Sequence, residues 1–146
     1  MKQLIHYIDG KFVAPATHTE TYAVINPATE GQVAEIRLGG ADDADRAVRA
    51  AHRVFDSYSM LNLSDRVDLL KALRSAYMKR YDEMVDAIIT EMGSPRTLSH
   101  DAQAECGPGH ITATLEASEQ IDWEHRSGGL GLVVREAVGV CGLITP

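Results

Sequence analysis

The sequence predicts an α/β fold, and three features of the chain lead to this prediction. Two pairs of β-rich segments fall within residues 1–40, and residues 41–122 carry apolar side chains at helical spacing. The closing segment, from Val138 to Thr145, is uncharged and shows no alternation of apolar and polar residues. A strand of that kind is covered on both faces, as in the parallel sheets of α/β proteins.

The composition is that of an ordinary globular domain, and it excludes several classes of protein. The 146 residues are 45% hydrophobic and 24% charged, with a formal charge of −7. No basic run is present to neutralise phosphates, so we expect no nucleic-acid partner. No apolar run approaches the roughly 20 residues that a membrane helix needs, and the first seven residues do not resemble a signal peptide. We therefore expect a cytoplasmic protein without a membrane segment.

The histidines and cysteines follow no metal or disulfide pattern. The six histidines are scattered without HxH or HExxH spacing, which favours surface or singly hydrogen-bonded imidazoles over a metal site. The two cysteines, Cys106 and Cys141, form no CxxC motif, so we expect no disulfide framework.

Two hairpins are predicted in residues 1–40. Asp9-Gly10 separates two short β-rich segments between Leu4 and Val13, and this dipeptide tolerates the positive φ angles of a tight hairpin turn. Thr21–Ile25 and Gln32–Ile36 form the second pair, with Asn26-Pro27 and Glu30-Gly31 supplying the turn between them.

Three helical regions are predicted in residues 41–122. Aspartates begin the first, and one face of it carries apolar residues at alternating steps of four and three: Ala44, Val48, Ala51, Phe55 and Tyr58. The second begins with Ser64 as its N-cap, breaks near Arg80 and stops at Gly93 and Pro95. The third runs from Ser99 to about Ile121, and Gly107-Pro108-Gly109 is expected to kink or split it.

Residues 128–146 are rich in glycine and valine, which favours strands. Gly128-Gly129-Leu130-Gly131 leads into a strand, so we interpret it as a hairpin entry and not as a dinucleotide phosphate loop, which must open a helix. Gly139 and Gly142 are expected to mark a bend and close backbone packing. A buried strand at the very end of the sequence, with no similar strand to pair with, suggests a chain cut from a larger sheet.

Four blocks of the sequence carry a resemblance. They are residues 26–29 (NPAT), 42–55 (DDADRAVRAAHRVF), 91–95 (EMGSP) and 135–146 (REAVGVCGLITP). In this order and spacing they resemble the NAD(P)-dependent aldehyde dehydrogenase family, whose blocks read N-P-A-T-G, D-x-x-x-A-V-x-A-A-x-x-A-F, E-x-G-K-P and R-E-P-V-G-V-x-G-x-I-x-P-W-N. Ala137 stands where proline is usual and Ser94 where lysine is common. The sequence ends before the Trp-Asn pair, whose asparagine is an oxyanion-hole donor in the family.

The resemblance implies an oxidoreductase that converts an aldehyde to a carboxylic acid with NAD or NADP. In the family a cysteine thiolate attacks the aldehyde to form a thiohemiacetal, and a glutamate later activates water. Both come from segments further along the family's chain, so the resemblance assigns no catalytic residue here. It implies that Ile144, Thr145 and Pro146 line the nicotinamide-ribose part of the cofactor cleft, at the carboxyl end of a strand. The alternative is that these three residues merely finish a core strand.

The resemblance also implies a division of residues 1–146 as part of a cofactor-binding domain. Residues 1–40 form hairpins, 41–122 helices, 123–138 an oligomerisation-type hairpin and 139–146 the first strand of a Rossmann-like sheet. In the family that hairpin pairs with another subunit, so we expect a homo-oligomer acting on a small-molecule aldehyde. Some members hold a monovalent cation at the positions of the Ile25 carbonyl and Glu91. A plain turn contact and a solvated carboxylate are the alternative there.

Two other functions are compatible with the residues. A non-catalytic interaction or oligomerisation module derived from the family is one, and a small enzyme using Cys106 as nucleophile is the other. Glu105 precedes Cys106, and its negative charge disfavours a thiolate. Cys141 is expected to be buried within the closing strand and unreactive. His52, His100 and His110 are conceivable bases, but no pattern pairs them with a nucleophile.

Overall fold

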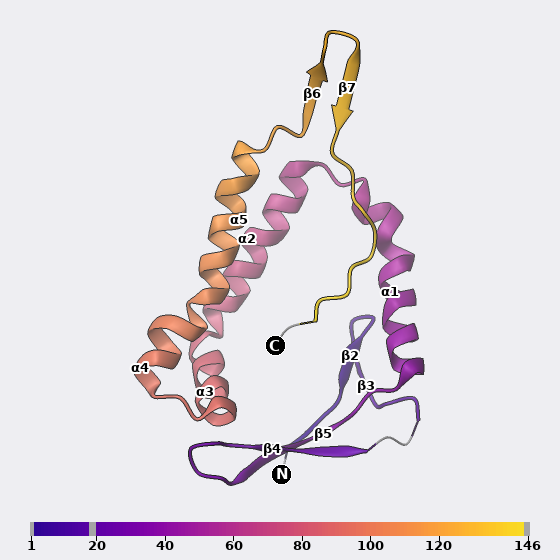
Figure 1. Ribbon diagram of the computed structural model, residues 1–146. Helices are drawn as coiled ribbons and strands as arrows, with labels where there is room; N and C mark the ends of the chain where they lie inside the picture. The colour runs from indigo at the N-terminus through magenta and orange to yellow at the C-terminus, as the bar shows by residue number, and fades with distance from the viewer. Residues whose placement is uncertain (1, 18–19, 145–146) are drawn as a thin grey trace.

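The computed structural model describes residues 2–17 and 20–144, and its elements follow the predicted order of strands, helices and strands. Figure 1 shows the N-terminal strands at one end, five helices beside and above them, and a long hairpin at the opposite end. The described residues mix helices and strands, as predicted. The described part of the chain contains no helix long and apolar enough to cross a membrane.

The first predicted hairpin is present and has the turn that its sequence requires. Strands β2 (His6–Ile8) and β3 (Lys11–Val13) pair antiparallel, with Tyr7 opposite Phe12 and their rings 5.0 Å apart. Asp9 and Gly10 between them have φ angles of 56° and 74°. Two successive residues with positive φ match the twist of a two-residue hairpin, and aspartate and glycine tolerate that conformation.

The second predicted pair is also present and gains a strand that the sequence pattern did not reveal. Strands β4 (Thr21–Ile25) and β5 (Gln32–Arg37) pair antiparallel, while β1 (Lys2–Leu4) joins β5 in parallel to give the order β1-β5-β4. Asn26 organises the connecting turn, because its side-chain oxygen accepts hydrogen bonds from the backbone of Ala28 (2.8 Å) and Thr29 (3.3 Å).

The first two helical regions form three helices, α1 (Ala41–Ser59), α2 (Leu63–Lys79) and α3 (Tyr81–Met92). The predicted break at Arg80 is confirmed, and Gly93 ends α3 with a φ of 65°. The predicted N-cap was wrong by two residues. The side chain of Asn62 caps α2 by accepting from the backbone of Asp65 at 2.8 Å, while Ser64 lies inside the first turn and donates to Asn62.

The third helical region is divided, although not where the glycines predicted. It consists of α4 (Arg96–Leu98), a π-helical segment η1 (Ser99–Ala104) and α5 (Cys106–Gln120), so the break falls at Glu105. Gly107-Pro108-Gly109 lies in the opening of α5 and does not kink it. A proline there costs no hydrogen bond, because the first N–H groups of a helix have no partner within it.

The hairpin predicted within residues 123–138 is present and extends beyond the helices. Strands β6 (Glu124–Ser127) and β7 (Gly131–Val134) pair antiparallel, and Gly128 and Gly129 turn between them with φ angles of 60° and 79°. The hairpin is anchored at its base, where the Trp123 indole N–H donates to the Ser118 carbonyl at 3.2 Å and the Arg66 guanidinium lies 5.0 Å from the Trp123 ring centre.

The predicted closing strand is absent from the described residues. Residues 135–144 have no strand assignment, and in Figure 1 they run back from the hairpin toward the N-terminal strands without joining a sheet. Val138 is 93% exposed and Leu143 89%. A strand is stabilised by a neighbour that satisfies its backbone groups, and none of the described strands occupies that place. The assignment of residues 139–146 as the first strand of a Rossmann-like sheet therefore stays a prediction, because no described strand lies beside it.

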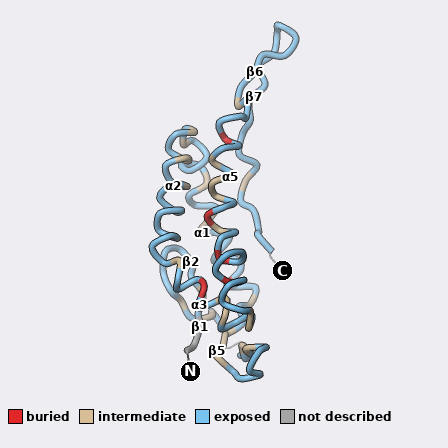
Figure 2. The backbone as a smooth tube through the Cα atoms, turned by 90° about the vertical axis from the view of Figure 1, so that its left-hand side faces the viewer, coloured by how far each residue is buried: buried red, intermediate tan, exposed pale blue. Residues whose placement is uncertain are grey.

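The buried core is small and sits where α3, η1 and α5 meet. Val85, Ala104 and Ser99 have no exposed surface, and Pro108 is also fully buried. Most of the remaining backbone is exposed, as the pale tube in Figure 2 shows. The predicted apolar face of α1 follows this trend, since Val48 is 54% and Tyr58 52% exposed.

Candidate functional site

The residues proposed to meet a cofactor lie at the end of the unpaired closing segment. Ile144 is 98% exposed, and Thr145 and Pro146 lie outside the described residues. An apolar side chain in that position is free to contact a ligand. The part of the chain that the structure describes supplies no opposite wall to Ile144, so it does not by itself form a cofactor cleft.

Both cysteines are exposed, so neither is a core thiol. Cys141 was predicted to be buried, but it is exposed because the strand expected around it does not form. Gly139 and Gly142 lie in the same segment, and the expected close packing is absent, since no described atom lies within 4 Å of a Cβ built at either. Gly139 does mark a bend, with a φ of 131°. Cys106 is also exposed.

The surroundings of Cys106 hold a structural cluster of tyrosines. The Tyr77 hydroxyl donates to the Ala104 carbonyl at 2.8 Å, and the Tyr81 hydroxyl lies 2.5 Å from the His100 carbonyl oxygen and 3.1 Å from a Glu105 carboxylate oxygen. The pKa of Tyr77 is raised by desolvation first and then by the nearby Cys106 and Glu105. Both tyrosines stay protonated and serve as hydrogen-bond donors to the π-helical segment.

No general base accompanies Cys106. The nearest histidine in sequence is His110, and neither it nor any other histidine in the described ranges hydrogen-bonds to a cysteine. His100 has its Nδ1 2.7 Å from an Asp101 carboxylate oxygen. A nucleophilic thiol needs an adjacent base or a lowered pKa. The arrangement is therefore that of a helix junction and does not form a nucleophile–base pair.

The two candidate cation positions lie near one junction. Gly93, two residues after Glu91, packs against the turn that follows Ile25, because a Cβ built at Gly93 would lie 2.7 Å from the Ala28 nitrogen and 3.1 Å from Pro27. Glu91 is exposed and Ile25 is 45% exposed. Within the described residues no group of three metal-ligating side chains gathers here or elsewhere.

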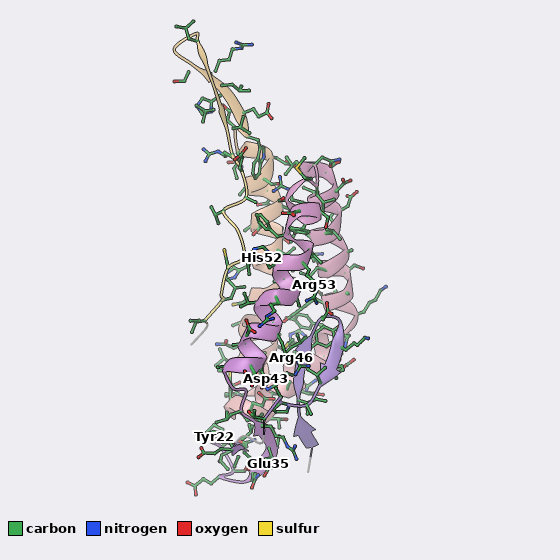
Figure 3. All side chains as sticks on the ribbon, turned by 90° about the vertical axis from the view of Figure 1, so that its right-hand side faces the viewer. Tyr22, Glu35, Asp43, Arg46, His52 and Arg53 are labelled. Carbon is green, nitrogen blue, oxygen red and sulfur yellow. The ribbon has the colours of Figure 1, made fainter. Side chains whose placement is uncertain are left out.

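A buried carboxylate that the motifs did not single out fixes the start of α1. Asp43 is 4% exposed and accepts hydrogen bonds from the backbone of Ala16 (2.9 Å) and Gly40 (3.2 Å) and from Arg46 (3.3 Å). Figure 3 shows Asp43 and Arg46 together on the first turns of this helix. Burial alone raises the pKa of Asp43, but the two backbone hydrogen bonds and the charges of His6 and Arg46 outweigh it, so its pKa is lowered.

Strand β7 of the long hairpin carries an apolar row of three successive exposed residues, whose side chains point alternately to its two faces. Leu132, Val133 and Val134 of β7 are 61%, 42% and 44% exposed, and β7 pairs with β6 alone among the described strands. An exposed apolar strand with unpaired backbone groups is a template for pairing with another chain.

Comparison with known proteins gives the same relatives from sequence and from structure. The profile of the aldehyde dehydrogenase family matches residues 12–146. A 3-succinoylsemialdehyde-pyridine dehydrogenase from a Pseudomonas species is 44% identical over 141 residues, which are 96% of this chain and 29% of the relative. A putative aldehyde dehydrogenase of Staphylococcus aureus is 39% identical over 140 residues, again 29% of its length. The chain thus spans less than a third of the curated relatives that it matches.

The solved structures agree. An aldehyde dehydrogenase from Bartonella henselae superimposes with a TM-score of 0.81 and 30% identity, covering 86% of this chain and 26% of that one. Aldehyde dehydrogenase C from Pseudomonas syringae, solved as a mutant with NAD+ and octanal, gives 0.78 and 31% identity over 84% of this chain and 25% of that one.

Proposed function

The chain belongs to the aldehyde dehydrogenase family, and we propose that the whole protein oxidises a small-molecule aldehyde to a carboxylic acid in the cytoplasm, with NAD or NADP accepting the hydride. The observation that carries this proposal is the match of the family profile to residues 12–146, with its blocks in order. The relatives solved with NAD+ support a nicotinamide cofactor for the family.

Within that enzyme the present residues supply framework and binding surface. We propose that residues 139–146 add a strand to a Rossmann-like sheet when neighbouring strands are present, and that Ile144, Thr145 and Pro146 then meet the nicotinamide-ribose. The exposure of Ile144 and the absence of any strand pairing in residues 136–144 support this assignment. The nucleophilic cysteine and the base then come from other segments of the protein, because Cys106 lacks a base and Cys141 lies on an exposed segment.

We further propose that the hairpin of residues 123–138 joins subunits into a homo-oligomer. The apolar row on β7 supports this role, since Leu132 and Val133 expose apolar surface beside an unpaired strand edge. The same observation favours the second candidate function, a non-catalytic oligomerisation module built on the family's N-terminal architecture. That module would assemble but show no response to a dinucleotide.

Formation of NADH or NADPH distinguishes the two functions. The whole protein is mixed with each cofactor and a panel of aldehydes that includes a semialdehyde bearing an aromatic ring, octanal and a short aliphatic aldehyde, and absorbance of the reduced cofactor is followed. We expect turnover that depends on the aldehyde. Absence of turnover across the panel, together with no effect of NAD+ or NADP+ on the melting temperature, would favour the oligomerisation module.

The same assay on the 146-residue chain alone tests whether the catalytic cysteine and base lie outside these residues. We expect no reduced cofactor from it, and Cys106→Ser in the whole protein should retain activity. Turnover by the short chain that disappears in the Cys106→Ser variant would show that this thiol is a nucleophile after all.

A further inference from the structure

A cleft between the first hairpin and α1 gathers an unusual share of the chain's positive charge. It measures about 280 Å³ and is lined by Ile8, Asp9, Lys11, Val13, Arg46, Arg49 and Arg53. Four of these seven residues are basic, in a chain with 14 Lys and Arg against 21 Asp and Glu. Both Arg46 and Arg53 lie on α1 beside the β2–β3 hairpin in Figure 3.

The helix spacing brings the three arginines to one side. Positions 46, 49 and 53 are separated by three and four residues, which are the separations of neighbours on a helix surface. The hairpin supplies the opposite wall, because Lys11 lies across from Ile8 at the turn end of β3 and the Asp9 carboxylate meets the Arg53 guanidinium at 3.0 Å. Guanidinium groups that converge from a rigid helix suit bidentate binding of phosphate oxygens.

The carboxylate partners of Arg49 and Arg53 leave these two cations available, whereas Arg46 is bonded to the buried Asp43. Arg49 pairs with Asp45, and their side chains are 73% and 51% exposed; Arg53 and Asp9 are 58% and 65% exposed. Exposed pairs of this kind contribute little free energy, so a multivalent anion can replace a carboxylate partner. Lys11 forms no ion pair with any residue that the structure describes. A ligand can therefore bind its ammonium without displacing a carboxylate.

From this convergence we propose that the cleft binds a small phosphate-bearing anion of the size of inorganic pyrophosphate or a phosphate monoester. A volume of about 280 Å³ lies at the lower end of ligand pockets and suits a small ligand. Arg46 is oriented by the buried Asp43 and keeps the helix wall in place. Ile8 and Val13 give the cleft apolar lining against which the ligand's non-phosphate part can rest.

The test is a calorimetric titration of the intact protein with inorganic pyrophosphate in saturating NAD+, so that a dinucleotide site does not contribute. Arg49→Gln should weaken binding about tenfold, since it removes a charge-assisted contact. Asp9→Asn should strengthen binding several-fold, because it removes the one acidic group of the cleft while asparagine still tolerates the positive φ of this turn. A gain in affinity cannot arise from misfolding.

Arg80→Gln is the matched control. Arg80 is 73% exposed and paired with Glu83 three residues away, but it lies outside the cleft. We expect its affinity to equal that of the unchanged protein. An equal loss for Arg80→Gln and Arg49→Gln, or no gain for Asp9→Asn, would overturn the site. Sulfate at the same ionic strength should bind more weakly, and equal heats for sulfate and pyrophosphate would indicate unspecific ion binding and overturn it too.

A second readout locates the ligand without relying on affinity. Phenylglyoxal modifies accessible arginines, and peptide mapping by mass spectrometry gives the rate at each one. Pyrophosphate should slow modification of Arg49 and Arg53 and leave the rate at Arg80 unchanged. Equal rates at all three with and without pyrophosphate would contradict the proposal. The outcome is independent of aldehyde oxidation, so failure of this site and failure of the proposed enzyme activity are distinguishable.

Discussion

Asp43 connects the loop before α1 to the first turn of that helix through the backbone of Ala16 and Gly40. Its lowered pKa means that the ionised carboxylate is favoured by folding. This contribution is fully present above the unfolded pKa, near about 3.9, and is lost as the pH falls through the lower folded pKa. The folded state should therefore weaken on the acid side below about pH 4.

Asp43→Asn tests this linkage. The amide cannot accept charge-assisted hydrogen bonds from both backbone groups and Arg46, so the melting temperature at neutral pH should fall. The difference between the two proteins should shrink as the pH is lowered below 4, as measured by circular dichroism. Asp68→Asn is the control, because that carboxylate is 76% exposed and pairs only loosely with Lys71 at 3.8 Å. Equal losses for the two variants would contradict the role of Asp43.

Gly93→Ala should destabilise the junction between α3 and the β4–β5 turn by about 1–3 kcal/mol, the usual cost of a non-glycine residue held in strained backbone. The φ of 65° disfavours a side chain, and the added Cβ would lie 2.7 Å from the Ala28 nitrogen. Urea denaturation measures the change. Gly109→Ala is the matched control, since nothing described lies within 4 Å of its Cβ, and alanine there should be neutral or stabilising by up to about 1 kcal/mol. A urea midpoint for Gly93→Ala equal to that of the unchanged protein would contradict the close contact between Gly93 and the β4–β5 turn.

Among the secondary-structure elements, the sequence correctly predicted the turns and helix ends that depend on the local residues. The Asp9-Gly10 turn and the stop at Gly93 both depend on residues that permit positive φ, and both are present. The pairing of β1 with β5 depends on residues more than 30 positions apart, and no periodicity encodes it. The burial of Cys141 failed for the same reason, because it depends on a strand's neighbours.

In the candidate sites, too, the residues could be identified from the sequence, but their surroundings could not. The family blocks identified Ile144, Thr145 and Pro146 by resemblance, and their role stays a prediction because Thr145 and Pro146 lie outside the described residues. The arginines at positions 46, 49 and 53 were visible as a three- and four-residue spacing, but that spacing is equally common on solvated helix faces. The cleft arises only because the β2–β3 hairpin packs beside α1, and this tertiary contact is not encoded in the spacing of the arginines.

The π-helical segment η1 is an element that no sequence signal predicted, and two tyrosines hold it. Tyr77→Phe leaves the carbonyl of Ala104, a fully buried residue, without its side-chain donor and should cost about 1–3 kcal/mol of unfolding free energy. Urea denaturation gives this value. Tyr58→Phe on α1, where the side chain is 52% exposed, should leave the midpoint unchanged. A loss no larger for Tyr77→Phe than for Tyr58→Phe would show that the hydroxyl does not hold the segment.

For the whole molecule, the long hairpin is the surface through which assembly is expected. Val133→Lys places a charge in the centre of the apolar row on β7 and should shift the whole protein toward smaller species in light scattering after size exclusion. Leu130→Lys is the control, because Leu130 is fully exposed at the turn and lies outside both strands. An unchanged mass for Val133→Lys would remove β7 from the interface.

The exchange rates of the backbone amides should differ between parts of the molecule. In the 146-residue chain, the amides of residues 136–144 should exchange as fast as an unfolded peptide, since their backbone joins no sheet, whereas those around Val85 should be the slowest. In the whole protein the same residues should become protected if they enter a sheet. Fast exchange in both would contradict the proposed strand.

The stretch of residues 136–144, which pairs with no strand, also bears on how the polypeptide leaves the ribosome. Nine extended residues reach at most about 32 Å, enough to link the hairpin to another folded part without fixing how the two meet. Synthesis can thus complete the helical cluster and its tyrosine bonds while later residues are still being made, as domains generally fold in the order of translation. During that interval the exposed apolar side chains of Val138, Leu143 and Ile144 would be open to aggregation and to chaperones.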